Sequence, residues 1–577
     1  MPADPRPEVL VAGAGPVGLT AAHELARRGL RVRLVDAAPG PARTSRAIAV
    51  HPRTLETLDQ MGVVDALRER GRENRAFTMF ASGRRLVRLQ ADYASMPTRF
   101  PYTLIVEQTA TETVLREAVA ALGVSVEWGV KVGDFEQDAD AVRVRLEHAD
   151  GTSEVCRAEW LVGCDGGHST VRKQLGLPLI GDSRDTWMLA DAPVRTDLVP
   201  DSIYWVHTGR QAMMMVPYAR EGHWRLLDTA PGAQGANGAP ERFARKLSAG
   251  LGTAVAVGEP EWTSVFTFQQ RMVPRMHDGR VFVAGDAAHV HSPASGQGMN
   301  TGIQEAYNLA WKLADVTRGH ADRALLDTYD EERVPIGRAL LGSTRTATFL
   351  VQFKNLLARL ALPAVFTVVR HVAPLRRAIQ RKVLGGMSGL RIGYGESSLS
   401  LWADEPPARQ APSAGAGFAP GERVSAAAAA HAGQPGPDAL AAELRDVRWT
   451  LLWAAGEARS EAAAAQAAAR AAASDAAWLS VRTLGARGGA PGALCDPGRI
   501  LRDALGLAPG GWLLIRPDGY VAARGHRLTG ETWETLLAEL GLGMDMDTVR
   551  ALQGSSSAPP ANRDKVLSTI AGQKDSR

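Results

Sequence analysis

The chain has 577 residues, of which 45% are hydrophobic, and its 66 lysine and arginine residues nearly balance 62 acidic ones, for a formal net charge of +4. This composition excludes a small disulfide scaffold and a fibrous repeat, and the length allows about three domains. The chain has no run of five or six like charges, so no electrostatic signature of nucleic-acid binding is present. We expect a small-molecule partner and no nucleic acid.

Three cysteines, Cys156, Cys164 and Cys495, form no CxxC motif. We therefore expect neither a disulfide framework nor a metal site, and a reducing cytoplasm fits. Residues 1–8 lack the basic segment of a signal peptide, and three basic residues interrupt the most apolar later stretch, residues 346–372. We expect a cytoplasmic protein without a membrane span.

The first motif lies at the start of the chain. Val9–Ala12 is a short apolar run typical of a buried strand, and the glycine-rich segment Gly13–Gly18 follows it directly. A helix is predicted over Leu19–Arg28 and a second strand over Arg31–Val35, which ends at Asp36. This strand, glycine loop, helix and acid order is typical of a dinucleotide-binding unit, although it does not distinguish NAD from FAD.

Each position of the motif has a physical purpose. Gly13 permits the tight turn, Gly15 lets a pyrophosphate approach the backbone, and Gly18 lets the helix pack on the strand. Pro16 and Val17 belong to the same cofactor-binding loop, whose helix N-terminus faces the phosphates with unpaired amides. Asp36 is predicted to hydrogen-bond a ribose hydroxyl.

Two later segments place acids beside glycines at strand ends. A strand near Trp160 runs into Cys164–Arg172, which contains Asp165 and Gly166, and a strand over Arg280–Ala284 runs into Gly285 and Asp286. A carboxylate there can accept hydrogen bonds from polyol hydroxyls. Farther on, Gly296–Gly302 opens a helix predicted over Ile303–Thr317 and can offer backbone amides to an electron-rich ring.

Together these segments resemble the p-hydroxybenzoate hydroxylase-type flavoprotein monooxygenases, over about residues 7–395. Gly13–Gly18 matches the family's FAD fingerprint, Asp165-Gly166 its DG motif and Gly285-Asp286 its GD motif. The resemblance implies a non-covalent FAD, NADPH or NADH as a transient co-substrate, and dioxygen. The sequence contains no second strand–GxGxxG–helix unit, so the nicotinamide is expected to bind without a domain of its own.

The resemblance also implies individual roles. Asp286 matches the acid that binds the ribityl chain, Arg46 the arginine near the FAD phosphates, and Gln108 the glutamine that contacts the flavin-side sugar or ribityl. The residues expected beside the isoalloxazine ring are Gly296, Gly298, Met299 and Asn300. Asp165 and Arg172 are implied to support FAD and nicotinamide binding, with an Asp–Arg pair that only holds the turn as the alternative. Asp36 and Glu305 stand where the family often has Glu and Asp, which preserves the charge.

The segment between the motifs is predicted to shape the substrate pocket. Strands are expected over Ile203–His207 and Gln211–Pro217, with Met213 and Met215 on one face and Met214 on the other. We assign Met213, Met215 and Pro293 to the pocket, with ordinary core packing as the alternative for the methionines. No catalytic acid or base stands out among the four candidates considered, which are His207, His223, Tyr204 and Tyr218.

Beyond about residue 400 the pattern changes. Strands are predicted over Trp449–Ala454 and Trp478–Thr483, then a hairpin with a Pro517-Asp518-Gly519 turn, and a last helix over Thr532–Leu540. This order resembles the thioredoxin-like C-terminal domain of the phenol and polyketide hydroxylase branches. Cys495 is alone, so a redox role is not supported. The alanine-rich helix within 457–473 fits either a homodimer contact or a solvated surface.

The predicted fold class is α/β. It comprises a Rossmann-type FAD-binding domain, an inserted mixed-sheet substrate domain and a C-terminal thioredoxin-like α/β domain. The FAD-binding domain takes residues 1–78, 101–181 and 270–345, and the substrate-binding domain takes 79–100 and 182–269. The rest divides into a helical segment 346–400, a linker 401–422, the thioredoxin-like domain 423–552 without CxxC, and a flexible tail 553–577.

The function implied is hydroxylation of a phenolic aromatic substrate by a C4a-hydroperoxide of the flavin, after the nicotinamide has reduced FAD. A multi-ring polyketide is the first choice of substrate, in antibiotic biosynthesis, and a simple phenol or phenylpropionate is the second. Baeyer–Villiger insertion, modification of an antibiotic, flavin oxidoreduction without hydroxylation, halogenation and non-catalytic flavin binding are the alternatives. No halogenase motif is recognised.

Overall fold

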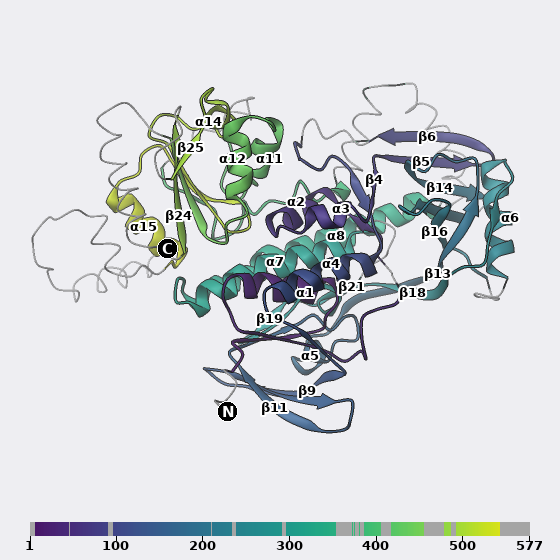
Figure 1. The fold of residues 1–577 in the computed structure, drawn as a ribbon, viewed down its shortest axis with the longest axis horizontal. Coiled ribbons are helices and arrows are strands. Elements are labelled where there is room, and N and C mark those ends of the chain that lie inside the picture. The colour runs from purple at the N-terminus through teal and green to yellow at the C-terminus, as the bar shows by residue number, and fades with distance from the viewer. Residues whose placement is uncertain are drawn as a thin grey trace, which may run out of the picture.

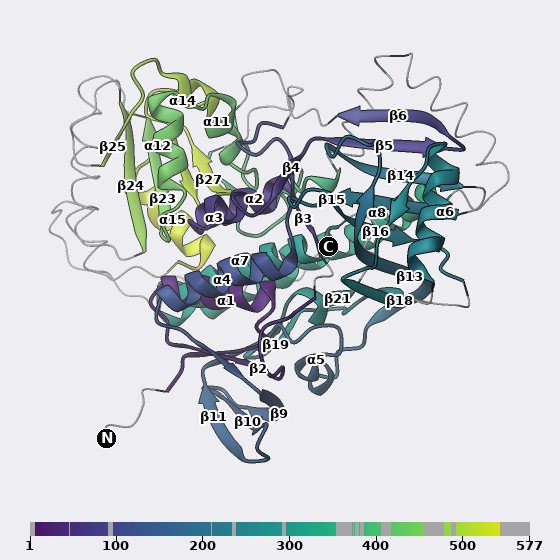
Figure 2. The same cartoon turned by 45° about the vertical axis from the view of Figure 1, so that its right-hand side comes forward.

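The structure is a computed structural model that describes residues 6–44, 47–90, 96–208, 211–232, 238–290, 296–352, 386–404, 417–454, 478–485 and 492–542, and residues 372, 374 and 380. In Figures 1 and 2 the long helix α7 runs through the middle of the molecule. A C-terminal α/β unit, coloured green to yellow, lies at one end and a large sheet at the other. None of the helices within these ranges is both long and apolar enough to cross a bilayer.

The first sheet has six strands in the order β19-β20-β12-β1-β2-β8. Its strands are β1 (Val9–Ala12), β2 (Val32–Asp36), β8 (Val126–Trp128), β12 (Trp160–Gly163), β19 (His277–Asp278) and β20 (Val281–Val283). All neighbours pair in parallel except β19 and β20. The continuous apolar runs of β1, β12 and β20 are buried, as strands covered on both faces must be.

Helices α1 (Pro16–Arg27), α4 (Gln108–Ala121) and α7 (Gly298–Thr317) pack together beside this sheet. The shorter helices of the region are α2 (Pro52–Gln60), α3 (Val64–Arg68) and α5 (Thr170–Gln174), and α8 (Thr328–Gln352) follows the 3-10 turn η3 (Arg323–Asp327). Two small sheets complete it, β9 (Val130–Gln137), β10 (Val142–His148) and β11 (Ser153–Ala158), and β3 (Ala49–Val50), β4 (Arg72–Asn74) and β7 (Thr103–Ile105). The predicted doubly wound cofactor domain is therefore present.

The second large sheet has nine strands, parallel and antiparallel, and corresponds to the mixed sheet predicted for the substrate domain. Eight follow the order β21-β18-β13-β16-β15-β14-β5-β6, and β17 (Ala256–Val257) pairs with β13. The strands are β5 (Ala76–Ala81), β6 (Arg84–Gln90), β13 (Ile180–Arg195), β14 (Ser202–Thr208), β15 (Gln211–Pro217), β16 (His223–Asp228), β18 (Trp262–Met272) and β21 (His289–Val290). Helix α6 (Ala239–Leu251) packs on one face and contributes Phe243 and Leu247 to the core there.

The C-terminal sheet follows the order β22-β27-β26-β23-β24-β25. Its strands are β22 (Leu401–Trp402), β23 (Trp449–Ala454), β24 (Leu479–Gly485), β25 (Ala493–Cys495), β26 (Trp512–Ile515) and β27 (Val521–Gly525). Strands β23 and β24 are parallel, whereas β26 is antiparallel to both β23 and β27. This is the predicted thioredoxin-like order. Its described helices are α11 (Ser425–Ala430), α12 (Pro435–Glu443), α14 (Ile500–Ala504) and α15 (Gly530–Leu540).

Several strands run past the predicted domain limits. Strand β5 begins at Ala76 rather than at residue 79, and β13 and β18 continue across the predicted limits at 181/182 and 269/270. Strand β22 lies in the predicted linker but pairs with β27 of the C-terminal sheet. The predicted alanine-rich helix and the tail 553–577 lie outside the described residues, so the homodimer contact stays a prediction.

Candidate active site

Three loops meet at one edge of the six-stranded sheet. They follow β1, β12 and β20, which are parallel neighbours, so their carboxyl ends lie side by side. The loops contain the glycine segment 13–18, the DG turn at 165–166 and the GD turn at 285–286. Ligands of open α/β sheets bind at this edge. The three motifs that the sequence singled out therefore form one site.

The glycine loop has close contacts at two positions and open space at the third. A Cβ on Gly13, whose φ is +102°, would lie 2.3 Å from the carbonyl oxygen of Cys164, and one on Gly18 would lie 1.8 Å from that of Gly13. A Cβ on Gly15 would meet no atom within 4 Å. Helix α1 begins at Pro16, next to this space, so its first N–H groups have no intrahelical partners. An anionic pyrophosphate fits here.

Asp36 holds the same loop from the end of β2. Its Oδ2 accepts a hydrogen bond from the backbone N–H of Ala14 at 2.6 Å, and its Oδ1 accepts one from that of Ala38 at 2.7 Å. Each carboxylate oxygen has a second lone pair, so these bonds do not prevent contact with a ribose. The ribose contact stays a prediction.

The DG turn presents a buried acceptor. Oδ2 of Asp165 accepts hydrogen bonds from the N–H groups of Thr170, at 2.7 Å, and Val171, at 3.2 Å. Its Oδ1 is buried without a hydrogen-bond partner among the described residues. A buried acceptor left unpaired is costly, and none of the described residues supplies a donor to this oxygen. A polyol hydroxyl meets that need.

Arg172 has a different role from the Asp–Arg pair considered as the alternative. Its Nη1 donates to the carbonyl oxygens of Gly167, at 3.0 Å, and Ala287, at 3.4 Å. Within the described part of the chain it forms no ion pair with Asp165. Arg172 therefore ties the DG turn to the GD turn.

The GD turn places Asp286 at the surface, and a buried pair formed by Glu305 and His289 supports the turn. Asp286 is exposed on the short 3-10 turn η1 (Gly285–Ala287). Below it, Glu305 of α7 is fully buried, accepts a hydrogen bond from the N–H of Gly285 at 2.9 Å, and lies 2.7 Å from Nε2 of His289. Glu305 thus supports the turn that carries Asp286. Sequence reasoning assigned no role to His289.

The charges of this pair predict a pH dependence. Burial disfavours both ions, yet their mutual attraction raises the pKa of His289 above its ordinary 6.5 and lowers that of Glu305 below 4.5. The contribution of charged His289 to stability is present below pH 6.5 and is lost as the pH rises through its raised pKa. The contribution of ionised Glu305 is present above pH 4.5 and is lost as the pH falls through its lowered pKa. We expect the stability difference between wild type and His289→Gln to be largest between these values. Urea midpoints of the apoprotein across the pH range measure it, and a difference that grows above pH 8 would contradict the pairing.

Helix α7 begins five residues earlier than predicted, at Gly298 instead of Ile303. Asn300 in its first turn is buried and engaged with the protein. Its Oδ1 accepts from the N–H of His51 at 2.8 Å, and its Nδ2 donates to the carbonyl oxygens of Ala49 and Gly296, each at 2.8 Å. The side chain therefore fixes the helix end, and the backbone N–H groups of the first turn remain to face a ligand.

The remaining predicted cofactor residues have mixed outcomes. Gln108 is the first residue of α4, where its Oε1 accepts from the N–H of Ala47 at 3.1 Å and its Nε2 donates to Glu112 at 2.8 Å. Arg46 and Pro293 lie outside the described residues. Their roles stay predictions.

The methionines of β15 require a correction. Met213 and Met215 are fully buried in the core between the sheet and α6, with Phe243 and Leu247, so the structure favours core packing for both. Because side chains alternate along a strand, Met214 points to the other face, where it packs with Trp187 and Trp205 and with Ile48, Ala49 and Ile105. The cluster on that face includes Ala49, whose Cβ would lie 3.2 Å from a Cβ on Gly296, two residues before α7 begins.

Partly exposed aromatic side chains gather on this same face. Phe77, Trp262 and Phe266 pack against its buried cluster without being fully covered. Nearby, the Tyr218 hydroxyl donates to Asp191 at 3.0 Å, and Asp191 binds the buried Arg225 through two hydrogen bonds of 2.7 and 2.6 Å. Burial, and the neighbouring Asp191 carboxylate, raise the pKa of the Tyr218 phenol.

The other three candidate acid–base residues are structural or peripheral. The Tyr204 hydroxyl donates to the Val199 carbonyl oxygen at 2.5 Å, and burial raises its pKa to about 12. Burial lowers the pKa of His207 to about 4, so its ring is neutral near pH 7. His223 lies 3.4 Å from the half-exposed Glu261. None of the three has the position of a catalytic base.

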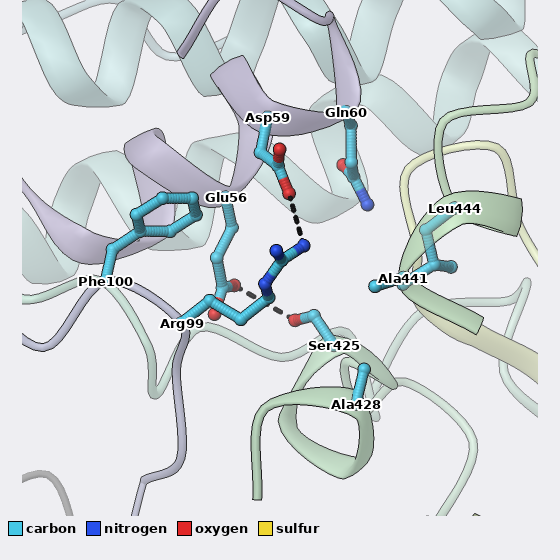
Figure 3. A pocket seen from close by; sticks show the side chains of 9 residues that line it. All are labelled: Glu56, Asp59, Gln60, Arg99, Phe100, Ser425, Ala428, Ala441 and Leu444. Carbon is cyan, nitrogen blue, oxygen red and sulfur yellow. Dashed lines mark hydrogen bonds and ion pairs between the residues drawn. The ribbon is translucent and has the colours of Figure 1, made fainter. Parts of the chain in front are cut away.

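One cavity lies elsewhere, between α2 and the C-terminal helices α11 and α12 (Figure 3). The residues that line it are Glu56, Asp59, Gln60, Arg99, Phe100, Ser425, Ala428, Ala441 and Leu444. It has room for about one water molecule, which the buried amide of Gln60 can bind, since that amide has no hydrogen-bond partner among the described residues. The cavity is therefore a feature of the domain interface and not a substrate site.

Comparisons with known proteins agree with this geometry. A sequence profile of the FAD binding domain matches residues 6–344. The chain is 48% identical, over 96% of its length and 97% of the relative's, to the 6-methylpretetramide 4-monooxygenase of Streptomyces rimosus. The solved structure of OxyS anhydrotetracycline hydroxylase from Streptomyces rimosus is similar with a TM-score of 0.68 and 30% identity, covering 92% of this chain and 99% of that one. CabE, an aromatic hydroxylase from angucycline biosynthesis, gives a TM-score of 0.66 and 27% identity, covering 93% and 99%.

The fold and the three converging loops define a flavoprotein of the aromatic hydroxylase class. The chain belongs to the family of FAD-dependent monooxygenases that carry this FAD binding domain. It uses FAD, with a reduced nicotinamide and dioxygen as co-substrates. The open space at Gly15 and the unpaired Oδ1 of Asp165 fit this cofactor.

Proposed function

We propose that the chain hydroxylates a phenolic ring of a multi-ring polyketide intermediate. The main support is the full-length similarity to a monooxygenase named for 6-methylpretetramide, a match that includes the C-terminal domain. The apolar, aromatic face that carries Phe77, Trp262 and Phe266, and whose cluster reaches Ala49 next to Gly296, suits a large flat ligand better than a single small phenol.

We propose further that the cofactor lies along the three loops. Gly13, Gly15, Pro16, Val17 and Gly18 would hold the pyrophosphate, and Asp36, Arg46, Gln108, Asp165 and Asp286 would bind its sugars, phosphates and ribityl chain. The first turn of α7, Gly298–Asn300, would direct backbone N–H groups at the ring, and Gly296 precedes it. When bound, FAD would accept a hydride from the nicotinamide and activate dioxygen.

The protein's own contribution is to orient the substrate and to exclude water. The aromatic face positions the ring to be hydroxylated, and burial of the surrounding apolar residues keeps bulk water away. The pair formed by Asp191 and Arg225 fixes the Tyr218 hydroxyl, whose oxygen retains a lone pair for a substrate hydroxyl. All three cysteines are free, which is compatible with the proposed action in the cytoplasm.

The proposal predicts coupled oxygen transfer. With labelled dioxygen and a panel of polyketide phenols, we expect one multi-ring compound to accelerate NADPH or NADH oxidation at least tenfold and to gain one labelled oxygen, as mass spectrometry would detect. Simple phenols and phenylpropionates are the control substrates. Faster turnover with a simple phenol would refute the polyketide assignment, and accelerated oxidation that yields only hydrogen peroxide with every compound would refute hydroxylation.

A further inference from the structure

The hairpin turn of the C-terminal domain inserts into the FAD-binding domain. Arg516 and Asp518, at the turn between β26 and β27, are 2% exposed, and they meet Lys312 of α7 and Glu332 of α8, which are 0% and 3% exposed. Nη2 of Arg516 lies 2.9 Å from Glu332 and 2.6 Å from Asp518, and Nζ of Lys312 lies 2.8 Å from Glu332. We call these four residues the buried ion cluster. Two positive and two negative groups balance.

Asp518 also contacts α7 directly. Its Oδ2 accepts hydrogen bonds from Nδ2 of Asn308 and from Nε1 of Trp311, both at 3.2 Å. The guanidinium of Arg516 lies over the Trp311 ring, 5.2 Å from its centre. Because a buried charge that loses its partners is costly, the turn and α7 have one favourable relative placement. The turn therefore fixes both the rotation and the axial position of the helix.

The other end of α7 is the end that faces the flavin in the proposed site. About twelve residues separate Asn300 from Lys312, or roughly 18 Å of straight helix. Glu305, between them, holds the GD turn through Gly285. The same helix therefore carries contacts to the ion cluster, to the GD turn and to the proposed flavin-facing turn.

The C-terminal domain also holds α2, whose first turn adjoins Asn300. Arg423 donates to Glu56 at 2.8 Å and Arg445 to Asp59 at 2.6 Å, and both carboxylates line the cavity shown in Figure 3. At the other end of α2, the backbone N–H of His51 binds Asn300. Both helices that converge near the flavin are thus anchored to the C-terminal domain at their far ends.

We propose that the Arg516–Gly519 turn is a positioning element for the flavin site, acting through α7 on the N–H groups of Gly298–Asn300. This rests on the proposed placement of the flavin at the first turn of α7. The turn touches neither flavin nor substrate, so its residues are positioning residues. The C-terminal domain then serves catalysis without any redox chemistry of its own.

The test compares full-length variants by their affinity for FAD and by the visible spectrum of the bound flavin. We expect Arg516→Met to raise the Kd of the apoprotein for FAD roughly tenfold and to shift the long-wavelength flavin band, an effect within the range of typical site-to-site coupling. Arg516→Lys keeps the charge and should restore part of the affinity. Asp518→Asn, which preserves the shape of the turn, should act in the same direction and serves if Arg516→Met does not fold.

The matched control is Arg524→Met. Arg524 is a buried arginine of β27, and the hydrogen bonds that its side chain donates to described residues go to the carbonyl oxygens of Phe418 and Gly506, at 2.6 and 3.0 Å. The Arg524→Met substitution should lower the unfolding midpoint, keep the Kd for FAD within about twofold of the wild-type value and leave the flavin band unchanged. Equal effects of the Arg516 and Arg524 variants on the spectrum, or no effect of the turn variants on either readout, would overturn the inference.

A variant at the flavin end separates the inference from the proposal on which it rests. Asn300→Ala should change the flavin spectrum if α7 borders the ring, because it removes three hydrogen bonds that fix the first turn. If Asn300→Ala alters the band and Arg516→Met does not, the positioning role alone fails. If neither alters it, the placement of the flavin fails as well.

Discussion

Asp286→Ala is expected to yield a folded protein that purifies without its yellow colour. Asp286 is exposed at the carboxyl end of β20, so its removal should change the free energy of unfolding of the apoprotein by no more than about 0.5 kcal/mol. A hydrogen bond to a charged group contributes about 1.5–3 kcal/mol, so loss of the ribityl contact should raise the Kd for FAD by roughly 10- to 100-fold. Titration of the apoprotein with FAD, followed by flavin fluorescence, measures this.

The strand supplies its own control. Asp278 lies in β19, before the first residue of β20 and therefore at the opposite end of that strand from Asp286. It pairs with Arg275 at 3.2 Å. Asp278→Ala should leave the Kd for FAD unchanged within about twofold, as expected for an exposed pair remote from the site. Wild-type retention of FAD by Asp286→Ala, or an equal loss by Asp278→Ala, would show that the ribityl chain binds elsewhere.

The cofactor domain could be predicted from sequence because its determinants are local. The sequence pattern of such a domain consists of an apolar run of four residues, a glycine where a side chain would clash, and an acid at a strand end. Each of these features can be recognised without knowing the rest of the fold. The sequence therefore predicted the loops after β1, β12 and β20 one by one, and the structure shows that they are adjacent. The start of α7 was misplaced because Gly298 and Gly302 suggest a loop, whereas the close approach of Val17 to Gly302 explains a glycine inside the helix.

Side chains that act through long-range contacts left no such pattern. Glu305 and His289 lie sixteen positions apart and meet only because α7 crosses below the GD turn. The face of β15 that borders the cofactor domain depends on which side α6 covers, and alternation alone predicts two faces without saying which is which. Met213 and Met215 were therefore assigned to the pocket, although they pack against α6.

The same limit applies to the C-terminal domain. The Pro517-Asp518-Gly519 segment predicted a hairpin turn correctly, since this chemistry is local. Nothing in those residues indicated that Asp518 and Arg516 would be buried against α7, more than two hundred positions earlier in the chain. In the sequence, a buried arginine, a buried lysine and two buried carboxylates cannot be distinguished from ordinary surface charges.

Glu332→Gln is expected to destabilise the protein by about 3–5 kcal/mol, because it leaves Lys312 and Arg516 buried without their shared carboxylate. Burial disfavours the ion, yet Arg516 and Lys312 lower the pKa of Glu332, so its contribution is present above the ordinary value of 4.5 and lost as pH falls below it. Urea denaturation followed by the fluorescence of the interface tryptophans Trp311, Trp449 and Trp512 measures the loss. The neighbouring Glu331→Gln is the control, since Glu331 is exposed and, among the described residues, its carboxylate accepts hydrogen bonds from Ser398 alone.

The pH profile of Glu332→Gln distinguishes a lost ion cluster from a simple packing defect. Burial lowers the pKa of Lys312 to about 8 from its ordinary 10.5 even with Glu332 present, and without that carboxylate it should fall further. The folded state then binds a proton more weakly than the unfolded state, so stability should rise with pH from the lowered pKa up to about 10.5. Lys312→Met added to Glu332→Gln should recover most of the stability near pH 7 and abolish this rise. A loss that is the same at pH 7 and pH 9.5, and that the second substitution does not relieve, would mean that the charges of the cluster do not hold the domains together.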